Sequence, residues 1–178
     1  MNYIFLAAGF EEIEALTVID ILRRADISIQ SVSITDKLEV VGAHDITVYA
    51  DCLLIEVDFT QADYLILPGG MPGATHLANC EALTSKLTMH HAAQKPLAAI
   101  CAAPLVLGRL GLLKGLDATC YPGFESELQG ARLSNQNVVQ SERIVTAKGP
   151  GYALDFALKL VATIKGEDVA AAVRKAMF

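Results

Sequence analysis

One cysteine lies where a reactive thiol is expected. Cys101 follows the apolar run of residues 97–100, and Pro104 opens the next helical pattern, so the thiol falls on a turn between a strand and a helix. Such a turn exposes a side chain at the end of a sheet, close to helix N–H groups, and favours the nucleophilic thiolate over the thiol. An inert core thiol is the commoner state of any one cysteine, and it is our interpretation of Cys52, Cys80 and Cys120.

Two other turns carry groups that could assist this thiol. Gly69 and Gly70 follow the apolar run 64–67, and glycine lets backbone N–H groups point at an oxyanion. Glu14 lies in the first turn of a predicted helix. Each feature alone has an ordinary explanation, a tight turn or an acid that suits the helix dipole. Because the carboxyl ends of parallel strands line one crevice, we expect these groups to face Cys101.

The elements that must position these turns alternate along the chain. A hairpin around Gly42 is expected within residues 39–50. Strands are predicted over residues 3–8, 27–34, 64–67, 97–101, 118–121 and 144–147, and helices over 11–24, 80–94, 152–164, 168–176 and from residue 104. This order predicts an α/β fold with a mostly parallel sheet and helices on both faces. No linker or repeat interrupts residues 1–178, so a single domain is expected.

Composition excludes several classes of function. The net charge is −6, whereas nucleic-acid binders need clustered Lys and Arg. No apolar run reaches the roughly 18 residues of a membrane span, so we expect no membrane partner. The N-terminal residues lack the basic region of a secretory signal, so a cytoplasmic location is expected. There is no zinc-type Cys/His cluster, dinucleotide fingerprint or Walker motif. We therefore expect no metal and no cofactor, and a small molecule as partner.

Four sequence runs resemble the DJ-1/PfpI superfamily, in order and over nearly the whole chain. They are AAGFEEIEALTVIDILRRA, YLILPGGMPGA, LAAICAAP and KGPGYALDFAL, and they are most similar to the DJ-1 branch with its bacterial relatives. The resemblance implies a flavodoxin-like doubly wound fold. It also implies that the Cys101 thiol is reactive and hydrogen-bonded to a protonated Glu14, with the Gly70 and Ala102 amides nearby. It further implies a homodimer that uses the first helix, including Asp20 and Arg24.

Several positions depart from the family pattern. Ala102 stands where peptidase-like members carry a histidine, so no local Cys–His pair can form. Tyr121 replaces a histidine of the DJ-1 branch. His44 falls where close relatives carry an arginine that reaches the partner subunit, so it is expected to act across the dimer. Residues 148–151 are predicted to form the turn into the last long helix, with glycine supplying positive φ.

The leading functional hypothesis from the sequence is a cysteine-dependent enzyme for small reactive carbonyls. The resemblance implies glyoxalase III or deglycase-like chemistry, methylglyoxal to hydroxy acid, by a cofactor-independent hydro-lyase or hydrolase. In this scheme the Cys101 thiolate adds to the carbonyl and Glu14 moves the proton. The alternative is a redox-sensing stress-response protein or chaperone in which Cys101 is oxidised. A peptidase or a thiazole phosphate biosynthesis protein is less favoured, because neither has a supporting motif.

Overall fold

A seven-stranded sheet forms the centre of the computed structural model, which describes residues 1–177. Its order is β10-β11-β7-β6-β1-β2-β5, and neighbouring strands are parallel except for the β10–β11 pair. The strands are β1 (Asn2–Leu6), β2 (Ile29–Ser33), β5 (Cys52–Leu53), β6 (Leu65–Leu67), β7 (Leu97–Ile100), β10 (Val138–Ser141) and β11 (Ile144–Ala147).

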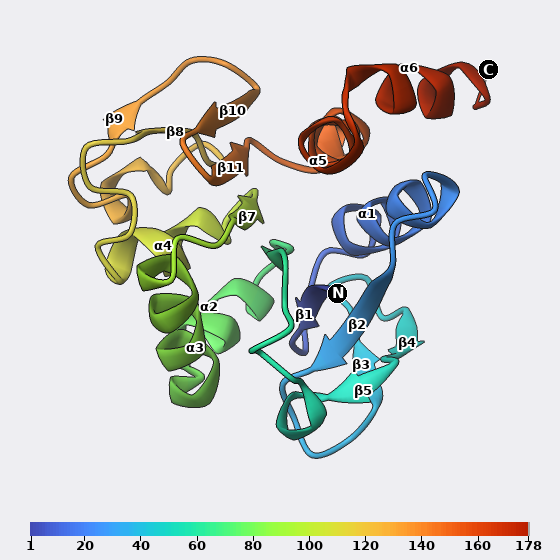
Figure 1. The fold of residues 1–178 in the computed structure, drawn as a ribbon. Helices are drawn as coiled ribbons and strands as arrows, with labels where there is room; N and C mark the ends of the chain where they lie inside the picture. The colour runs from blue at the N-terminus through green and yellow to red at the C-terminus, as the bar shows by residue number, and fades with distance from the viewer. Residues whose placement is uncertain (178) are drawn as a thin grey trace.

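Helices cover both faces of this sheet (Figure 1). Alternate residues of β1 enter different cores, with Ile4 and Leu6 in one and Tyr3 and Phe5 in the other. The first core includes residues of α1 (Glu12–Arg24), α5 (Ala153–Lys165) and α6 (Glu167–Lys175). The second includes residues of α2 (Gly73–Asn79), α3 (Glu81–Ala92) and α4 (Pro104–Arg109). The strand order β2-β1-β6-β7-β11 is that of a flavodoxin-like fold, so the predicted fold class is confirmed.

The expected hairpin is present and lies against the turn after β1. It consists of β3 (Glu39–Val41) and β4 (Thr47–Tyr49), which pair antiparallel. Gly9 donates its backbone N–H to the carbonyl of Val41, and Ala43 donates to that of Phe10. These bonds hold the hairpin loop beside the first turn of α1.

Three expectations about the elements were wrong. The strand expected over 118–121 is only β8 (Asp117–Ala118), which pairs with β9 (Arg132–Leu133) outside the main sheet. Instead, the Thr119 N–H donates to Thr146 Oγ1, and the Tyr121 N–H donates to the Cys101 carbonyl. No strand was expected between residues 121 and 144, where the antiparallel edge strand β10 lies. A separate helix, α2, precedes α3.

Short 3-10 helices occupy Leu54–Glu56, Glu125–Glu127 and Pro150–Tyr152. Among the described helices, none is both long and apolar enough to cross a membrane.

Candidate active site

Cys101 lies on a tight turn between β7 and α4. Its φ is +64°, a left-handed conformation that is uncommon for residues other than glycine. The Cys101 N–H donates to the Ala147 carbonyl at 2.9 Å, and its carbonyl accepts from the Tyr121 N–H at 2.7 Å. These two bonds hold the backbone in this conformation, so the thiol has a fixed position at the carboxyl end of β7.

Glu14 is a fully buried carboxyl group in the first turn of α1. Its Oε2 atom accepts the Gly69 N–H at 2.7 Å, whereas Oε1 is buried and has no hydrogen-bond partner among residues 1–177. The Cys101 thiol lies beside this carboxyl, close enough for hydrogen bonding to affect the pKa of both groups. Burial raises the pKa of Glu14 to about 7, despite the opposing effects of Gly69 and Cys101. When protonated, this carboxyl is a potential hydrogen-bond donor beside the thiol.

Gly69 is the residue that lets the thiol and the carboxyl approach each other. A Cβ atom at this position would lie 2.6 Å from the Cys101 Cβ and 2.7 Å from the Glu14 Oε2. Its N–H group holds Glu14 and so does not serve the oxyanion as expected. The N–H groups of Gly70 and Ala102 instead lower the pKa of the Cys101 thiol.

The expected preference for a thiolate in the free chain was wrong. Burial, followed by the charge and hydrogen bonding of Glu14, raises the pKa of Cys101 to about 12. These effects outweigh the two amides, because burial separates a thiolate from water and a second negative charge is unfavourable next to a buried carboxylate. The thiol and the carboxyl therefore act as a pair, in which ionisation of one group opposes ionisation of the other.

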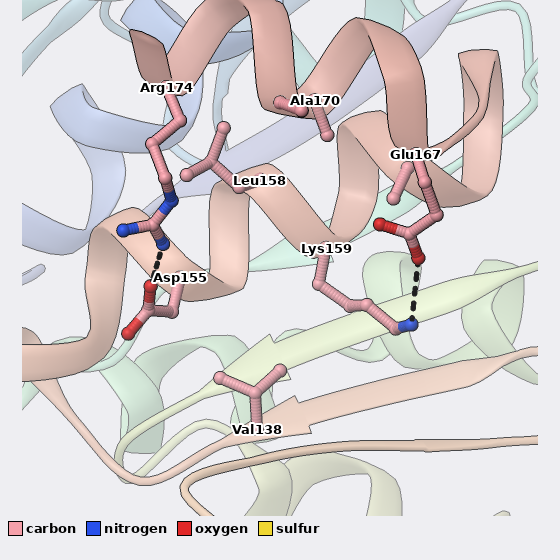
Figure 2. A pocket seen from close by; sticks show the side chains of 9 residues that line it. Val138, Asp155, Leu158, Lys159, Glu167, Ala170 and Arg174 are labelled. Carbon is pink, nitrogen blue, oxygen red and sulfur yellow. Dashed lines mark hydrogen bonds and ion pairs between the residues drawn. The ribbon is translucent and has the colours of Figure 1, made fainter. Parts of the chain in front are cut away.

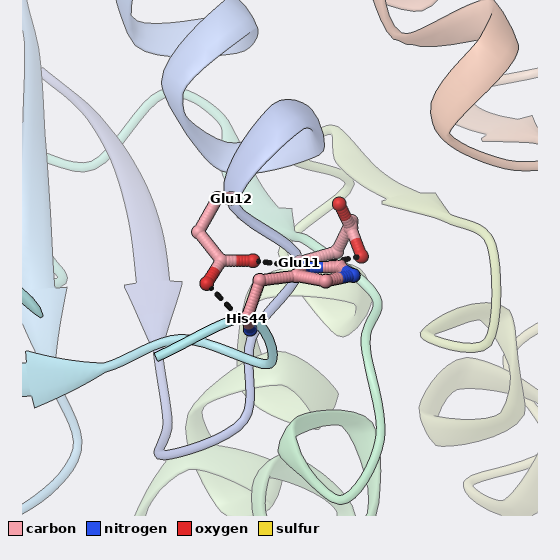
Figure 3. Close-up of side chains that lie close together, drawn as sticks. All are labelled: Glu11, Glu12 and His44. Atoms are coloured by element: carbon pink, nitrogen blue, oxygen red, sulfur yellow. Dashed lines mark hydrogen bonds and ion pairs between the residues drawn. The ribbon is translucent and has the colours of Figure 1, made fainter. Parts of the chain in front are cut away.

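His44 lies beside Glu11 and Glu12 of its own chain (Figure 3). Its Nδ1 is 2.8 Å from Glu12 Oε2 and 3.7 Å from Glu11 Oε2, and its backbone N–H donates to Glu12 Oε1 at 2.7 Å. The ring remains 65% exposed. Its expected role across a dimer stays a prediction.

A surface pocket of about 310 Å³ lies beside the turn that carries Cys101, and it was not predicted from the sequence. It is lined by Tyr121, Pro122, Lys148, Gly149, Pro150, Gly151 and Tyr152. Gly149 has an extended φ of 165°, so the expected positive φ was wrong at this position. A Cβ on Gly149 would lie 2.9 Å from the Tyr121 ring and 4.0 Å from the Cys101 Sγ. Gly149 therefore provides clearance beside the thiol. The Lys148 ammonium group donates to the Asn135 carbonyl at 2.7 Å.

A second hollow, of about 450 Å³, lies between α5 and α6 (Figure 2). Two ion pairs join these helices across it, Arg174 with Asp155 and Lys159 with Glu167. None of its lining residues belongs to the turns that carry Cys101 and Glu14. We therefore assign no part of the candidate active site to it.

The chain is similar to known proteins over almost its full length. It is 37% identical over 172 residues to protein DJ-1 homolog B of Arabidopsis thaliana, covering 96% of this chain and 39% of that protein. It spans about two fifths of the length of the two Arabidopsis relatives it matches. It is 33% identical over 161 residues to the glutathione-independent glyoxalase DJR-1.2 of Caenorhabditis elegans, covering 89% of this chain and 84% of that protein.

Solved structures and a family match agree with these relatives. Oxidized DJ-1 of Toxoplasma gondii has a TM-score of 0.95 and 37% sequence identity, covering 99% of this chain and 96% of that one. DJ-1beta of Drosophila melanogaster has a TM-score of 0.93 and 30% sequence identity, and the match covers 99% of this chain and 96% of that one. Residues 2–163 match the DJ-1/PfpI family. The chain therefore belongs to the DJ-1/PfpI family.

Proposed function

We propose that this protein is a cysteine-dependent enzyme that converts small α-oxoaldehydes such as methylglyoxal into hydroxy acids without a cofactor. The observation that carries the proposal is the buried Glu14 carboxyl beside the Cys101 thiol, with its Oε1 unpaired among the described residues. A nucleophile next to a proton carrier is the arrangement that covalent catalysis needs. One relative is named a glutathione-independent glyoxalase, which supports the same chemistry.

The first step is addition of sulfur to the aldehyde carbon. The thiol proton passes to Glu14 while an S–C bond forms and the C=O π electrons move onto the oxygen. The negative charge of the Glu14 carboxylate thus passes to the substrate oxygen, and the total charge of the site stays the same during the attack. The amides of Gly70 and Ala102, which face the sulfur in the free protein, are the donors nearest to the new oxyanion. Glu14 then gives its proton to that oxygen, which yields a hemithioacetal and leaves Glu14 ionised.

The second stage moves electrons within the substrate and needs no external oxidant. Glu14 removes the proton from the carbon bonded to sulfur while the adjacent carbonyl oxygen takes up a proton, which gives an enediol. Glu14 then delivers a proton to the second carbon, and the hydroxyl on the first carbon loses its proton as its C=O bond forms. The first carbon is oxidised to a thioester and the second is reduced to an alcohol. Water then attacks the thioester, the C–S bond breaks, and the sulfur regains its proton. The sum is one α-oxoaldehyde plus one water giving one hydroxy acid.

A redox sensor is the second candidate, because the same geometry fits an oxidised sulfur. A protonated Glu14 Oε1 would donate to an oxygen on a sulfinate at Cys101. One structure similar to this chain is of a DJ-1 in its oxidized form. A peptidase is not proposed, because Ala102 supplies no histidine next to the thiol.

Counting products per thiol separates the two candidates. We expect purified protein to form many hydroxy-acid molecules per chain from methylglyoxal, and Cys101→Ser to abolish turnover because a hydroxyl ionises too weakly to attack. Cys80→Ser is the matched control, since Cys80 is a free, partly buried cysteine outside the site, and it should retain activity. A single adduct per chain without product, detected by mass spectrometry, would instead support a sensor and exclude the enzyme.

A further inference from the structure

Three potential metal ligands from separate parts of the chain converge beside the hairpin loop. They are the carboxylates of Glu11 and Glu12 and the imidazole of His44, and one ligand atom from each lies within 4.8 Å of the others. The Nδ1 atom of His44 is 2.8 Å from Glu12 Oε2 and 3.7 Å from Glu11 Oε2. Ligands about 2.0–2.2 Å from a tetrahedral ion lie roughly 3.3–3.6 Å apart. Small side-chain movements would therefore accommodate an ion.

Protein cations balance the charges of this cluster only in part, because His44, when protonated, carries one positive charge beside two carboxylates. The side chains of Glu11 and Glu12 are only 12% and 5% exposed. Glu11 makes no side-chain capping bond, and its only ion-pair contact among residues 1–177 is the long one to His44. No lysine or arginine in this part of the chain pairs with either acid. Nearly buried charges require a paired group or a metal ion, so the excess negative charge favours a cation.

The backbone around these ligands is fixed. Glu12 Oε1 accepts the His44 backbone N–H at 2.7 Å, and a Cβ at Gly42 would lie 2.2 Å from the same oxygen. The Glu11 N–H donates to the Gly69 carbonyl at 2.9 Å. Two ligands are thus held at the start of α1, while the exposed His44 ring closes the cluster from the solvent side (Figure 3).

From this arrangement we infer that Glu11, Glu12 and His44 bind one divalent transition-metal ion of the Zn²⁺ type. An imidazole with two carboxylates suits Zn²⁺ and its neighbours better than Ca²⁺ or Mg²⁺, which prefer oxygen ligands alone. Three protein ligands leave at least one position for water or another small ligand. The site contains no thiol, so it is chemically distinct from Cys101. The sequence indicated no metal site because 32 residues separate Glu12 from His44.

Calorimetric titration with Zn²⁺ tests this site, in a Cys101→Ser background that removes the candidate reactive thiol as a competing ligand. We expect one Zn²⁺ per chain, with binding at least tenfold weaker after His44→Gln and after Glu11→Gln. His91→Gln, a change on α3 outside the cluster, is the matched control and should bind as the parent does. Thermal unfolding of each variant verifies that it is folded.

Two further readouts complete the test. Co²⁺ bound in place of Zn²⁺ should give visible bands without a sulfur charge-transfer band, since none of the ligands is a thiolate. Absence of saturable binding, or His44→Gln binding as tightly as the parent, would overturn the inference. A sulfur charge-transfer band would overturn it as well, because it would place the ion on a cysteine.

Discussion

At the scale of single residues, the chemistry depends on one proton shared by the partly buried Cys101 thiol and the buried Glu14 carboxyl. Burial raises the pKa of Glu14 to about 7 and, together with Glu14, that of Cys101 to about 12. Neither side chain alone is an efficient catalyst at neutral pH, because one is half ionised and the other is a thiol. Together they exchange a proton without creating a new charge, which a buried site tolerates.

The stability of Glu14→Gln relative to wild type should depend on pH. The carboxyl ionises near 4.5 in the unfolded chain and near 7 in the folded one, so the folded state holds the proton longer. Raising the pH through this window therefore costs the wild type stability, up to about 3 kcal/mol. Gln has no such cost. The free energy of unfolding is measured in urea at pH 5 and pH 8. Relative to wild type, the variant should be more stable at pH 8 than at pH 5. A difference that is the same at both pH values would contradict the assigned pKa shift.

At the scale of elements, three turns at the carboxyl ends of β1, β6 and β7 build the site. Gly69 lies between the other two turns, so Gly69→Ala would place a methyl group against Cys101 and Glu14. We expect a loss of about 1–3 kcal/mol in unfolding free energy and slower alkylation of Cys101. Gly151→Ala is the control, since its Cβ meets nothing within 4 Å, and it should change stability by less than about 0.5 kcal/mol. Equal effects of the two substitutions would argue against close packing at Gly69.

Buried elements were predictable because their residues are apolar in runs. The runs at β1, β6, β7 and β11, and the periodicity of α1 and α5, gave the correct fold class. The edge strand β10 was missed because its mixed sequence VVQS is only partly buried. Helix α2 was missed because GATHLAN lacks an apolar period. Contacts with other parts of the fold determine whether such segments become strands or helices. The periodicity of the sequence does not show these contacts.

The candidate site was predictable where a residue lies on the turn after a predicted strand or in the first turn of the helix that follows it. Cys101 and Glu14 were expected to meet, and the structure brings them together. Gly149 was missed because it matters through its close approach to the Tyr121 ring. Tyr121 is 28 positions away in the sequence, so the sequence does not show this contact. The preference for a thiolate was wrong because the sequence shows the helix that favours ionisation, and does not show the burial that opposes it.

At the scale of the whole molecule, an exposed apolar face on α1 is available for assembly. Ile13 and Leu16 are 56% and 40% exposed, although the helix buries its opposite side against α5. Asp20 and Arg24 pair within the same helix at 2.6 Å. A two-fold dimer would place this surface against itself.

Sedimentation at micromolar concentration should show a dimer that Leu16→Glu shifts toward monomer, because the charge would be buried in the interface. Met89→Glu is the matched control, since Met89 is 63% exposed on α3, over the other face of the sheet, and the variant should remain dimeric. A monomeric wild type, or equal behaviour of the two variants, would place the interface elsewhere.

The pH dependence of Cys101 alkylation tests the shared proton most directly. The rate constant for iodoacetamide is measured by mass spectrometry in wild type and in Glu14→Gln between pH 5 and 10. A fully protonated pair contains no thiolate, so the wild-type rate should rise with pH and level off near pH 7, once the pair holds a single proton. In Glu14→Gln the thiol titrates alone, and its rate should continue to rise past pH 7. Profiles that coincide would contradict a proton shared between Cys101 and Glu14.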